Sequence, residues 1–156
     1  MKVLVLGYGN PYRGDDGLGP LLAERVAQWL ASLGEAVELW VGQQLLPELA
    51  EELINHDVAI FCDASAVPLE DGFLLEELDI SSDPEGLTLH SVSPQWLLGL
   101  AQSLAGRMPK ACLLSVEGES FDFREGLTPR CEERAKAALQ RFQIWWKNGN
   151  DSAVMI

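Results

Sequence analysis

The sequence predicts an α/β fold: a single-domain three-layer αβα sandwich whose mostly parallel, twisted sheet carries helices on both faces. Two observations predict it. Short apolar runs typical of strands alternate along the chain with longer segments of helical periodicity. These short runs are continuously apolar, which is typical of parallel strands buried on both faces. The length of 156 residues suits one domain, and no internal repeat or linker marks a second.

The first half of the chain supplies most of the predicted sheet. We expect strands at 3–6, 37–41 and 58–62, and helices at 17–33 and 47–54. The strand predictions rest on short apolar runs, the first of which ends at Gly7. The first helix is predicted because its large apolar residues recur at spacings of three and four and Gly34 follows as a stop signal. Pro47 opens the second helix.

The second half of the chain completes the alternation. We expect strands at 73–78 and 111–116, a loop at 79–88, and helices at 94–104 and 129–146. The last helix begins with Thr128 and Pro129, residue types favoured as the N-cap and the first helical residue. Its apolar positions are expected to face the core. Residues 148–156 are expected to form a flexible tail, so the predicted domain spans 1–147.

The charge balance excludes several classes of partner. The chain has 11 Lys and Arg against 24 Asp and Glu, a formal net charge of -13 at pH 7. Binding to phosphate backbones needs clustered basic residues, so nucleic acid and anionic membranes are poor partners. An acidic surface favours cations and basic protein segments. No apolar run approaches the ~18 residues of a membrane span, and the N-terminal apolar run is too short for a signal peptide. We therefore expect a soluble, cytoplasmic protein with no membrane partner.

Several common catalytic and metal-binding motifs are missing. The cysteines, Cys62, Cys112 and Cys131, form no C-x-x-C pair, which disfavours a zinc knuckle or a redox dithiol. Cys62 and Cys112 lie in apolar runs and are expected to be buried as small apolar side chains. The sequence contains neither H-E-x-x-H nor G-x-S-x-G. His56 follows a predicted helix and is expected to cap its C-terminus.

Polar residues gather where the predicted strands end. In an open α/β sheet, ligands bind outside the carboxyl ends of the strands. A glycine loop with Asp15 and Asp16 follows the first strand, Asp63 follows the strand at 58–62, and His90 precedes the helix at 94. Two carboxylates and one imidazole from three segments form an O/O/N ligand set. Such a set suits a first-row divalent metal and leaves coordination positions open.

Each of these residues also has a simpler structural interpretation. Asp15 or Asp16 could N-cap the helix that follows, and the other acid would then be left free. Alone, Asp63 is more typical of a loop acid, and His90 of a surface histidine. The loop begins G-x-G like a dinucleotide-binding motif, but Tyr12 replaces the third glycine and two carboxylates at the helix entrance would repel a pyrophosphate.

The glycine loop carries a family likeness. The run G-Y-G-N-P-Y-R-G-D-D-G-L-G at 7–19 resembles the signature of the nickel–iron hydrogenase maturation proteases. The loop residues that frame the site in this signature are Gly7, Gly9, Asn10, Gly14, Asp15, Gly17 and Gly19. The similarity continues with Asp63 in F-C-D-A, His90 in L-H-S-V-S-P and G-L-T-P at 126–129, and runs from about residue 3 to 142. Residues 44–50 and 117–123 resemble the branch that serves soluble, bidirectional, NAD(P)-linked hydrogenases.

The resemblance implies a phosphorylase/hydrolase-like fold and a specific reaction. Members of this family are endopeptidases that remove a short C-terminal extension from the precursor of the hydrogenase large subunit. The cut follows a basic residue and occurs only after nickel insertion. By position, Asp16, Asp63 and His90 are implied as the nickel-contacting and catalytic residues, and Asp16 stands where some members have Glu.

The same resemblance sets the expected cofactor and partner. The precursor supplies the nickel, so no tightly bound cofactor is expected in the free enzyme. The expected partner is the nickel-loaded precursor of the large subunit. The sequence leaves the oligomeric state open, with a monomer as a plausible form.

Three alternatives stay open at this point. Nickel can act as a template and Lewis acid, or Asp16 or Asp63 can act as general base. A peptidyl-tRNA hydrolase shares the G-x-G-N-P opening seen at 7–11, but it needs a histidine about ten residues after Asn10, and His56 is the first histidine here. A checkpoint protein or chaperone could bind the nickel-loaded precursor through the same residues without cutting it.

Overall fold

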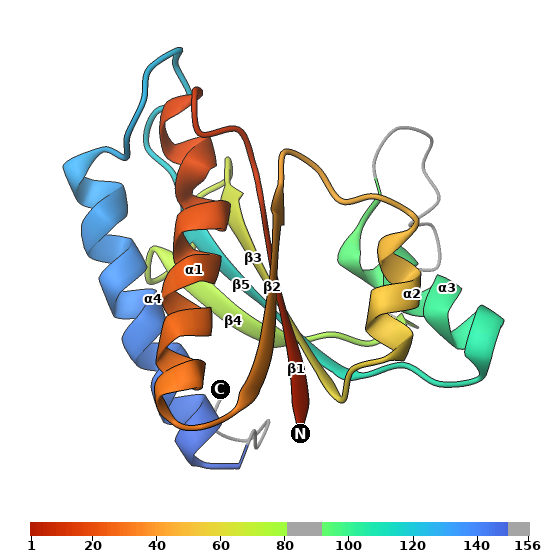
Figure 1. Ribbon diagram of the computed structural model, residues 1–156. Helices are drawn as coiled ribbons and strands as arrows, with labels where there is room; N and C mark the ends of the chain where they lie inside the picture. Colours follow the sequence, from red (N-terminus) through yellow and green to blue (C-terminus); the bar gives the residue numbers. More distant parts are fainter. Residues whose placement is uncertain (81–91, 150–156) are drawn as a thin grey trace.

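The computed structural model describes residues 1–80 and 92–149 as a mixed sheet between two layers of helices (Figure 1). The strands are β1 (Lys2–Tyr8), β2 (Ala36–Gly42), β3 (Val58–Ser65), β4 (Phe73–Glu77) and β5 (Lys110–Glu117). The helices are η1 (Gly14–Gly17, a 3-10 turn), α1 (Leu18–Ser32), α2 (Leu49–Ile54), α3 (Pro94–Ala105) and α4 (Pro129–Lys147). The predicted alternation of strands and helices is confirmed.

The strand order in the sheet is β2-β1-β3-β5-β4. All neighbouring strands are parallel except β4, which pairs antiparallel with β5 at the edge. The chain runs from β1 outward to β2 and then crosses back past β1 to β3. The strand order therefore reverses between β1 and β3, and in open α/β sheets the crevice for ligands lies at this switch point.

Helices cover both faces of the sheet, as the continuous apolar strands predict. Helices α1 and α4 lie on one face, and α2 and α3 lie on the other (Figure 1). Alternate residues of β1 face opposite cores: Val3 and Val5 pack toward α1 and α4, whereas Leu4 and Leu6 pack toward α2 and α3. All four side chains are buried. The sheet is thus covered on both faces, and the carboxyl ends of its strands are where a site can form.

Two local features differ from the sequence prediction. Strand β3 does not end before Asp63 but continues to Ser65, because its last three residues pair with Ser115, Val116 and Glu117 of β5. The first helix is preceded by the turn η1, which contains both Asp15 and Asp16. The prediction that one of these acids N-caps the helix is wrong, since Gly17 occupies the N-cap position of α1 and no side chain bonds there.

Other local predictions are confirmed. Thr128 caps α4 by accepting a hydrogen bond from the Cys131 backbone at 3.3 Å. His56 Nδ1 lies 2.5 Å from the Glu52 carbonyl oxygen in the last turn of α2, which fits a capping role. Cys62 and Cys112 are buried as predicted, Cys131 is buried as well, and all three are free thiols.

Some predictions fall outside the described residues. These are most of the loop at 79–88, His90 and most of the tail at 148–156. Helix α4 ends at Lys147, and the domain boundary at that residue stays a prediction. In the described ranges, no helix combines the length and the apolar character that crossing a membrane requires.

Candidate active site

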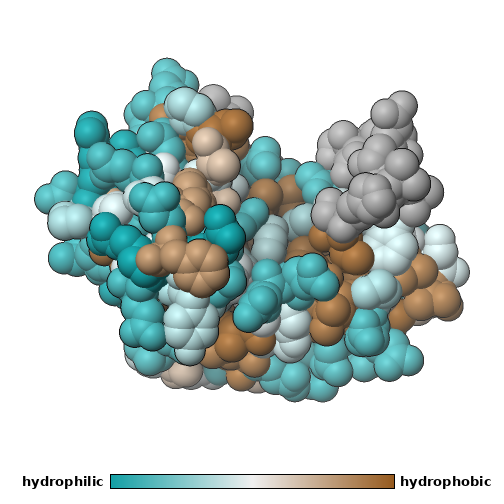
Figure 2. Space-filling model, turned by 90° about the horizontal axis from the view of Figure 1, so that it is seen from above, coloured by the Kyte–Doolittle hydropathy of each residue, from teal (hydrophilic) through white to brown (hydrophobic). Residues whose placement is uncertain are grey.

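Three polar side chains meet at the switch point of the sheet. Tyr8 is the last residue of β1, Asp63 lies near the carboxyl end of β3, and Asp16 sits in the turn η1 that follows β1. All three are half-buried. Figure 2 looks down onto this edge of the sheet, where apolar side chains are scattered among hydrophilic ones. The site therefore combines charge with partial shielding from water.

Asp16 is held by the loop that precedes it. Its carboxylate oxygen Oδ2 accepts a hydrogen bond from the Asn10 backbone at 2.6 Å. Asn10 in turn accepts from the Tyr12 backbone at 2.9 Å through its side-chain oxygen. Gly9 has a φ of +146°, and a Cβ at that position would overlap the carbonyl oxygen of Asp16. Only glycine fits there, because the loop backbone passes directly against the acid.

Asp63 lies beside Tyr8 and close to Asp16. Burial is the main cause that raises the pKa of Asp63 to about 7, and the neighbouring charge of Asp16 raises it further. Hydrogen bonds from the Ala64 backbone and from the Tyr8 hydroxyl oppose this rise. Burial and the Asp63 charge likewise raise the pKa of Tyr8, so the phenol stays protonated and donates to the carboxylate. The two predicted acids therefore share one electrostatic environment.

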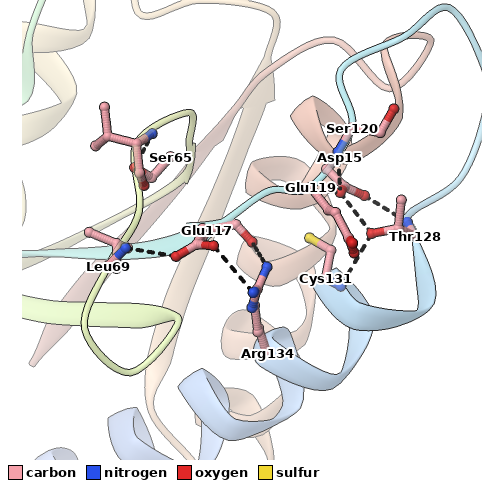
Figure 3. Close-up of polar contacts among 10 residues, drawn as sticks. Asp15, Ser65, Leu69, Glu117, Glu119, Ser120, Thr128, Cys131 and Arg134 are labelled. Atoms are coloured by element: carbon pink, nitrogen blue, oxygen red, sulfur yellow. Dashed lines mark hydrogen bonds and ion pairs between the residues drawn. The ribbon is translucent and has the colours of Figure 1, made fainter.

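Asp15 is bound within the structural framework, apart from the pair formed by Asp16 and Asp63. Its side chain is fully buried and turns toward the start of α4 (Figure 3). It accepts hydrogen bonds from the Thr128 backbone at 2.7 Å, the Thr128 hydroxyl at 2.8 Å, the Glu119 backbone at 2.7 Å and the Ser120 backbone at 3.1 Å. Burial works against its ionisation, but these hydrogen bonds outweigh burial and lower the pKa of Asp15 below its usual range.

The remaining framework residues of the signature keep backbones close together. A Cβ on Gly7 would meet the Gly19 carbonyl oxygen and the Ala23 side chain at 2.5 Å. Gly14, with φ +58°, lies where a Cβ would meet the Ser120 carbonyl oxygen at 2.6 Å. The contact at Gly7 holds the end of β1 against α1, and the contact at Gly14 holds the loop after β1 against Ser120. The loop that carries Asp16 therefore starts from a tightly packed strand and lies against the loop after β5.

A cleft lies beside Tyr8. It has a volume of about 240 Å³ and is lined by Tyr8, by Val92 before α3, and by residues of the loop between β2 and α2, among them Gln44, Leu45 and Pro47. Tyr8 therefore belongs to two structures at once, because its ring lines the cleft and its hydroxyl donates to Asp63. A peptide segment bound in this cleft would contact Tyr8, which is hydrogen-bonded to Asp63.

The structure brings together two of the three predicted site residues. Asp16 and Asp63 converge, whereas His90 lies outside the described residues. Within the described ranges, no group of three His, Cys, Asp or Glu side chains is placed to hold a metal ion. Sequence reasoning missed Tyr8. The signal that could have found it is a phenol between two glycines at the end of an otherwise apolar strand.

Comparison with known proteins places the chain in a family. No sequence model of a protein family matches the chain. A curated relative, the hydrogenase 2 maturation protease of Escherichia coli (strain K12), is 31% identical over 147 residues, which cover 90% of this chain and 88% of the relative. The chain belongs to the hydrogenase maturation protease family. It is therefore a peptidase, and the peptidyl-tRNA hydrolase alternative falls away.

Solved structures agree with this membership. The hydrogenase maturating endopeptidase HybD from E. coli superposes with a TM-score of 0.67 at 28% identity, covering 96% of this chain and 94% of that one. The hydrogenase 2 maturation peptidase from Thaumarchaeota archaeon SCGC_AB-539-E09 has a TM-score of 0.62 at 25% identity, with 97% and 100% covered. The HycI protease from Thermococcus kodakarensis KOD1, at 22% identity and a TM-score of 0.68, shares the fold, with 90% and 89% covered. The narrower resemblance to the branch for soluble bidirectional hydrogenases stays a prediction.

Proposed function

We propose that this maturation protease removes the C-terminal extension of a nickel–iron hydrogenase large-subunit precursor after nickel insertion, in the cytoplasm. Nickel belongs to the substrate in this proposal, and Asp16, Asp63 and His90 contact it through its open coordination positions. The observation that carries the proposal is the convergence of Asp16 and Asp63 at the switch point, beside a cleft that can receive a peptide. Val92, two residues after His90 in the sequence, lines the same cleft.

The donor chemistry suits this role. Two carboxylates with one imidazole form an O/O/N set that binds first-row divalent metals. An enzyme that contributes only part of the coordination sphere binds the metal well only when the precursor supplies the rest. Processing would then depend on nickel without a resident metal in the protease. A bound nickel ion can orient the scissile segment and polarise its carbonyl group.

A carboxylate is also available as a general base. The pKa of Asp63 is about 7, close to neutral pH. A base with such a pKa accepts a proton readily while about half of it is ionised. Asp16, in contrast, is engaged by the Asn10 backbone at 2.6 Å. These observations favour Asp63 as the group that takes a proton from the attacking water. In this alternative Asp63 acts as the base instead of contacting the nickel, and Asp16 and His90 remain as the nickel contacts.

An intact-mass assay tests the proposal. The cognate precursor, nickel-loaded or nickel-free, is incubated with the wild-type protein, and its mass is followed. We expect loss of a C-terminal peptide from the nickel-loaded precursor alone. Cleavage of both forms would remove nickel as the recognition element. Binding of the loaded precursor without a change in mass would favour the checkpoint alternative.

A further inference from the structure

A group of exposed aromatic and basic side chains lies at the rim of the site. We call Tyr12, Arg13, Phe123 and Arg124 the rim patch. Phe123 is 82% exposed and Tyr12 is 56% exposed, while both arginines are exposed as well. The guanidinium of Arg13 lies over the Phe123 ring, 5.4 Å from its centroid. The patch therefore presents an apolar ring with a cation stacked on it.

The rim patch is held in place by backbone hydrogen bonds. Its two loops, which follow β1 and β5, lie side by side at the upper edge of the molecule in Figure 1. Arg124 donates to the Tyr12 carbonyl at 3.0 Å, and Gly14 donates to the Arg124 carbonyl at 2.8 Å. Asp15 anchors the same two loops through its buried carboxylate. Phe123 is thus exposed on a loop whose backbone is already fixed. Binding to a partner therefore costs little free energy for ordering the loops.

The rim patch is continuous with the candidate active site. The backbone of Asp16 donates to the Arg13 carbonyl at 3.2 Å, so one turn of chain carries both a patch residue and a site carboxylate. A protein whose C-terminal segment reaches Asp16 and Asp63 must bring its folded body close to this rim. Binding of the C-terminal segment in the cleft is not enough to position the folded body, because the cleft accommodates only a short segment.

The chemistry of the rim patch is that of an interface. Exposed aromatic residues and arginine are enriched among the residues that dominate protein–protein binding. Among the residues that the structure describes, neither Arg13 nor Arg124 forms an ion pair, although the chain carries a net charge of -13. Their charges are available to a carboxylate on another molecule. The patch fits a surface that offers an apolar pocket bordered by acidic side chains.

We propose that the rim patch docks the folded body of the hydrogenase large-subunit precursor, with the Phe123 ring in an apolar pocket and Arg13 and Arg124 paired with carboxylates beside it. This inference rests on the proposed function, since it names the partner surface of the same site. Docking at the rim holds the precursor while its C-terminal segment enters the cleft. Recognition of the body is then separate from recognition of the nickel.

The test compares Phe123→Ala and Arg13→Ala with matched controls. Leu104→Ala removes an apolar side chain that is 63% exposed on α3, and Arg107→Ala removes an exposed arginine away from the rim. Processing of the nickel-loaded precursor is followed by intact mass at several precursor concentrations, and binding is measured by biolayer interferometry. We expect Phe123→Ala to raise Kd and KM at least about tenfold, Arg13→Ala to raise them about threefold or more, and neither to change kcat. The controls should match the wild type, and all variants should keep their Tm.

The outcomes separate this inference from the function on which it rests. If the wild type neither binds nor cuts the precursor, the proposed function fails. If the wild type cuts and Phe123→Ala retains its Kd and KM, the docking inference is overturned. A fall in kcat alone would assign the patch to the positioning of Asp16 and would also overturn it. The inference would also be overturned if the wild type formed a dimer that Phe123→Ala dissociates while the Kd for the precursor is unchanged. The patch would then join two copies of this chain.

Discussion

The buried carboxylate of Asp15 accepts hydrogen bonds from both the backbone nitrogen and the hydroxyl of Thr128, at 2.7 and 2.8 Å, across 113 residues of sequence. Thr128 is also the N-cap of α4. One carboxylate therefore ties the loop of the candidate site to the last helix of the fold. The adjacent Asp16 instead accepts a hydrogen bond from the Asn10 backbone, so the two neighbouring acids have different partners in the fold.

The first prediction concerns the stability that Asp15 supplies. Asp15→Asn replaces one acceptor oxygen with a donor that faces other donors, leaving buried hydrogen-bonding groups unpaired. We expect the free energy of unfolding at pH 7 to fall by roughly 2–4 kcal/mol, measured by urea denaturation. Asp122→Asn, a change at an exposed acid in the loop after β5, is the control and should shift it by less than about 0.5 kcal/mol. Equal effects of the two variants would contradict the assigned role.

The second prediction is the pH dependence of that stability. The pKa of Asp15 is lowered in the folded protein relative to about 3.9 in the unfolded chain. Its contribution is therefore fully present above about pH 4 and is lost as the pH falls through the folded-state pKa. The difference in unfolding free energy between the wild type and Asp15→Asn should be constant from pH 5 to 7 and shrink below about pH 4. A difference that grows on acidification would refute this assignment.

Most of the fold could be predicted from the sequence because the signals are local. Apolar runs, helical periodicity and the Thr128–Pro129 cap each act within a few residues. The end of β3 could not be predicted in this way. Polar residues after Cys62 indicate a strand end, but pairing with β5 carries the strand on to Ser65. Tertiary pairing here outweighs a local polarity signal.

The third prediction is a titration within the candidate site. The pKa of Asp63 should be about 7 in the free protein, as followed by NMR of its carboxyl carbon. Asp16→Asn should lower it because a neighbouring negative charge is removed, and Tyr8→Phe should raise it because a donor to the carboxylate is lost. If both variants shifted the pKa of Asp63 in the same direction, the two neighbours would not act on Asp63 as the structure indicates.

The raised pKa of Asp63 also has a consequence for stability. The pKa of Asp63 is about 7 in the folded protein and about 3.9 in the unfolded chain. Between these two pH values the folded protein therefore binds more protons than the unfolded chain. This residue's contribution to stability therefore declines as the pH rises from about 4 to 7. Asp63→Asn should remove that decline, so its stability relative to the wild type should be greater at pH 8 than at pH 5.

The candidate site could be predicted from the sequence only in part. Asp16 and Asp63 stand at strand ends, where the topology of an α/β sheet brings ligand-binding residues together. The roles of Asp15 and Asp16 could not be separated, since they are the same residue type at adjacent positions. What separates them is the turn η1, which directs one toward Thr128 and leaves the other beside Asn10. Partners more than a hundred residues away in the sequence leave no local signal.

The fourth prediction tests the site residues directly. Asp16→Ala, Asp63→Ala and His90→Ala should each lower the rate of precursor processing at least about 100-fold while keeping the wild-type circular dichroism spectrum. The reason is that each change removes either a nickel contact or a proton acceptor. Asp122→Ala serves as an exposed acid control near the site and should process at the wild-type rate. Wild-type rates in all three variants would show that the reaction takes place elsewhere.

The fifth prediction concerns the backbone path that places Asp16. Gly9→Val puts a branched side chain where a Cβ already overlaps the Asp16 carbonyl, at a φ of +146° that valine does not adopt. Gly14→Val meets the Ser120 carbonyl at 2.6 Å from its Cβ, at a φ of +58°. Both should lower the free energy of unfolding by roughly 2–4 kcal/mol and abolish processing. Gly99→Ala in α3 is the control. A Cβ there meets nothing within 4 Å, so this variant should be as active as the wild type and more stable by about 0.5–1 kcal/mol. If Gly9→Val processed normally, Asp16 would not depend on this loop path, and its placement in the site would have to be abandoned.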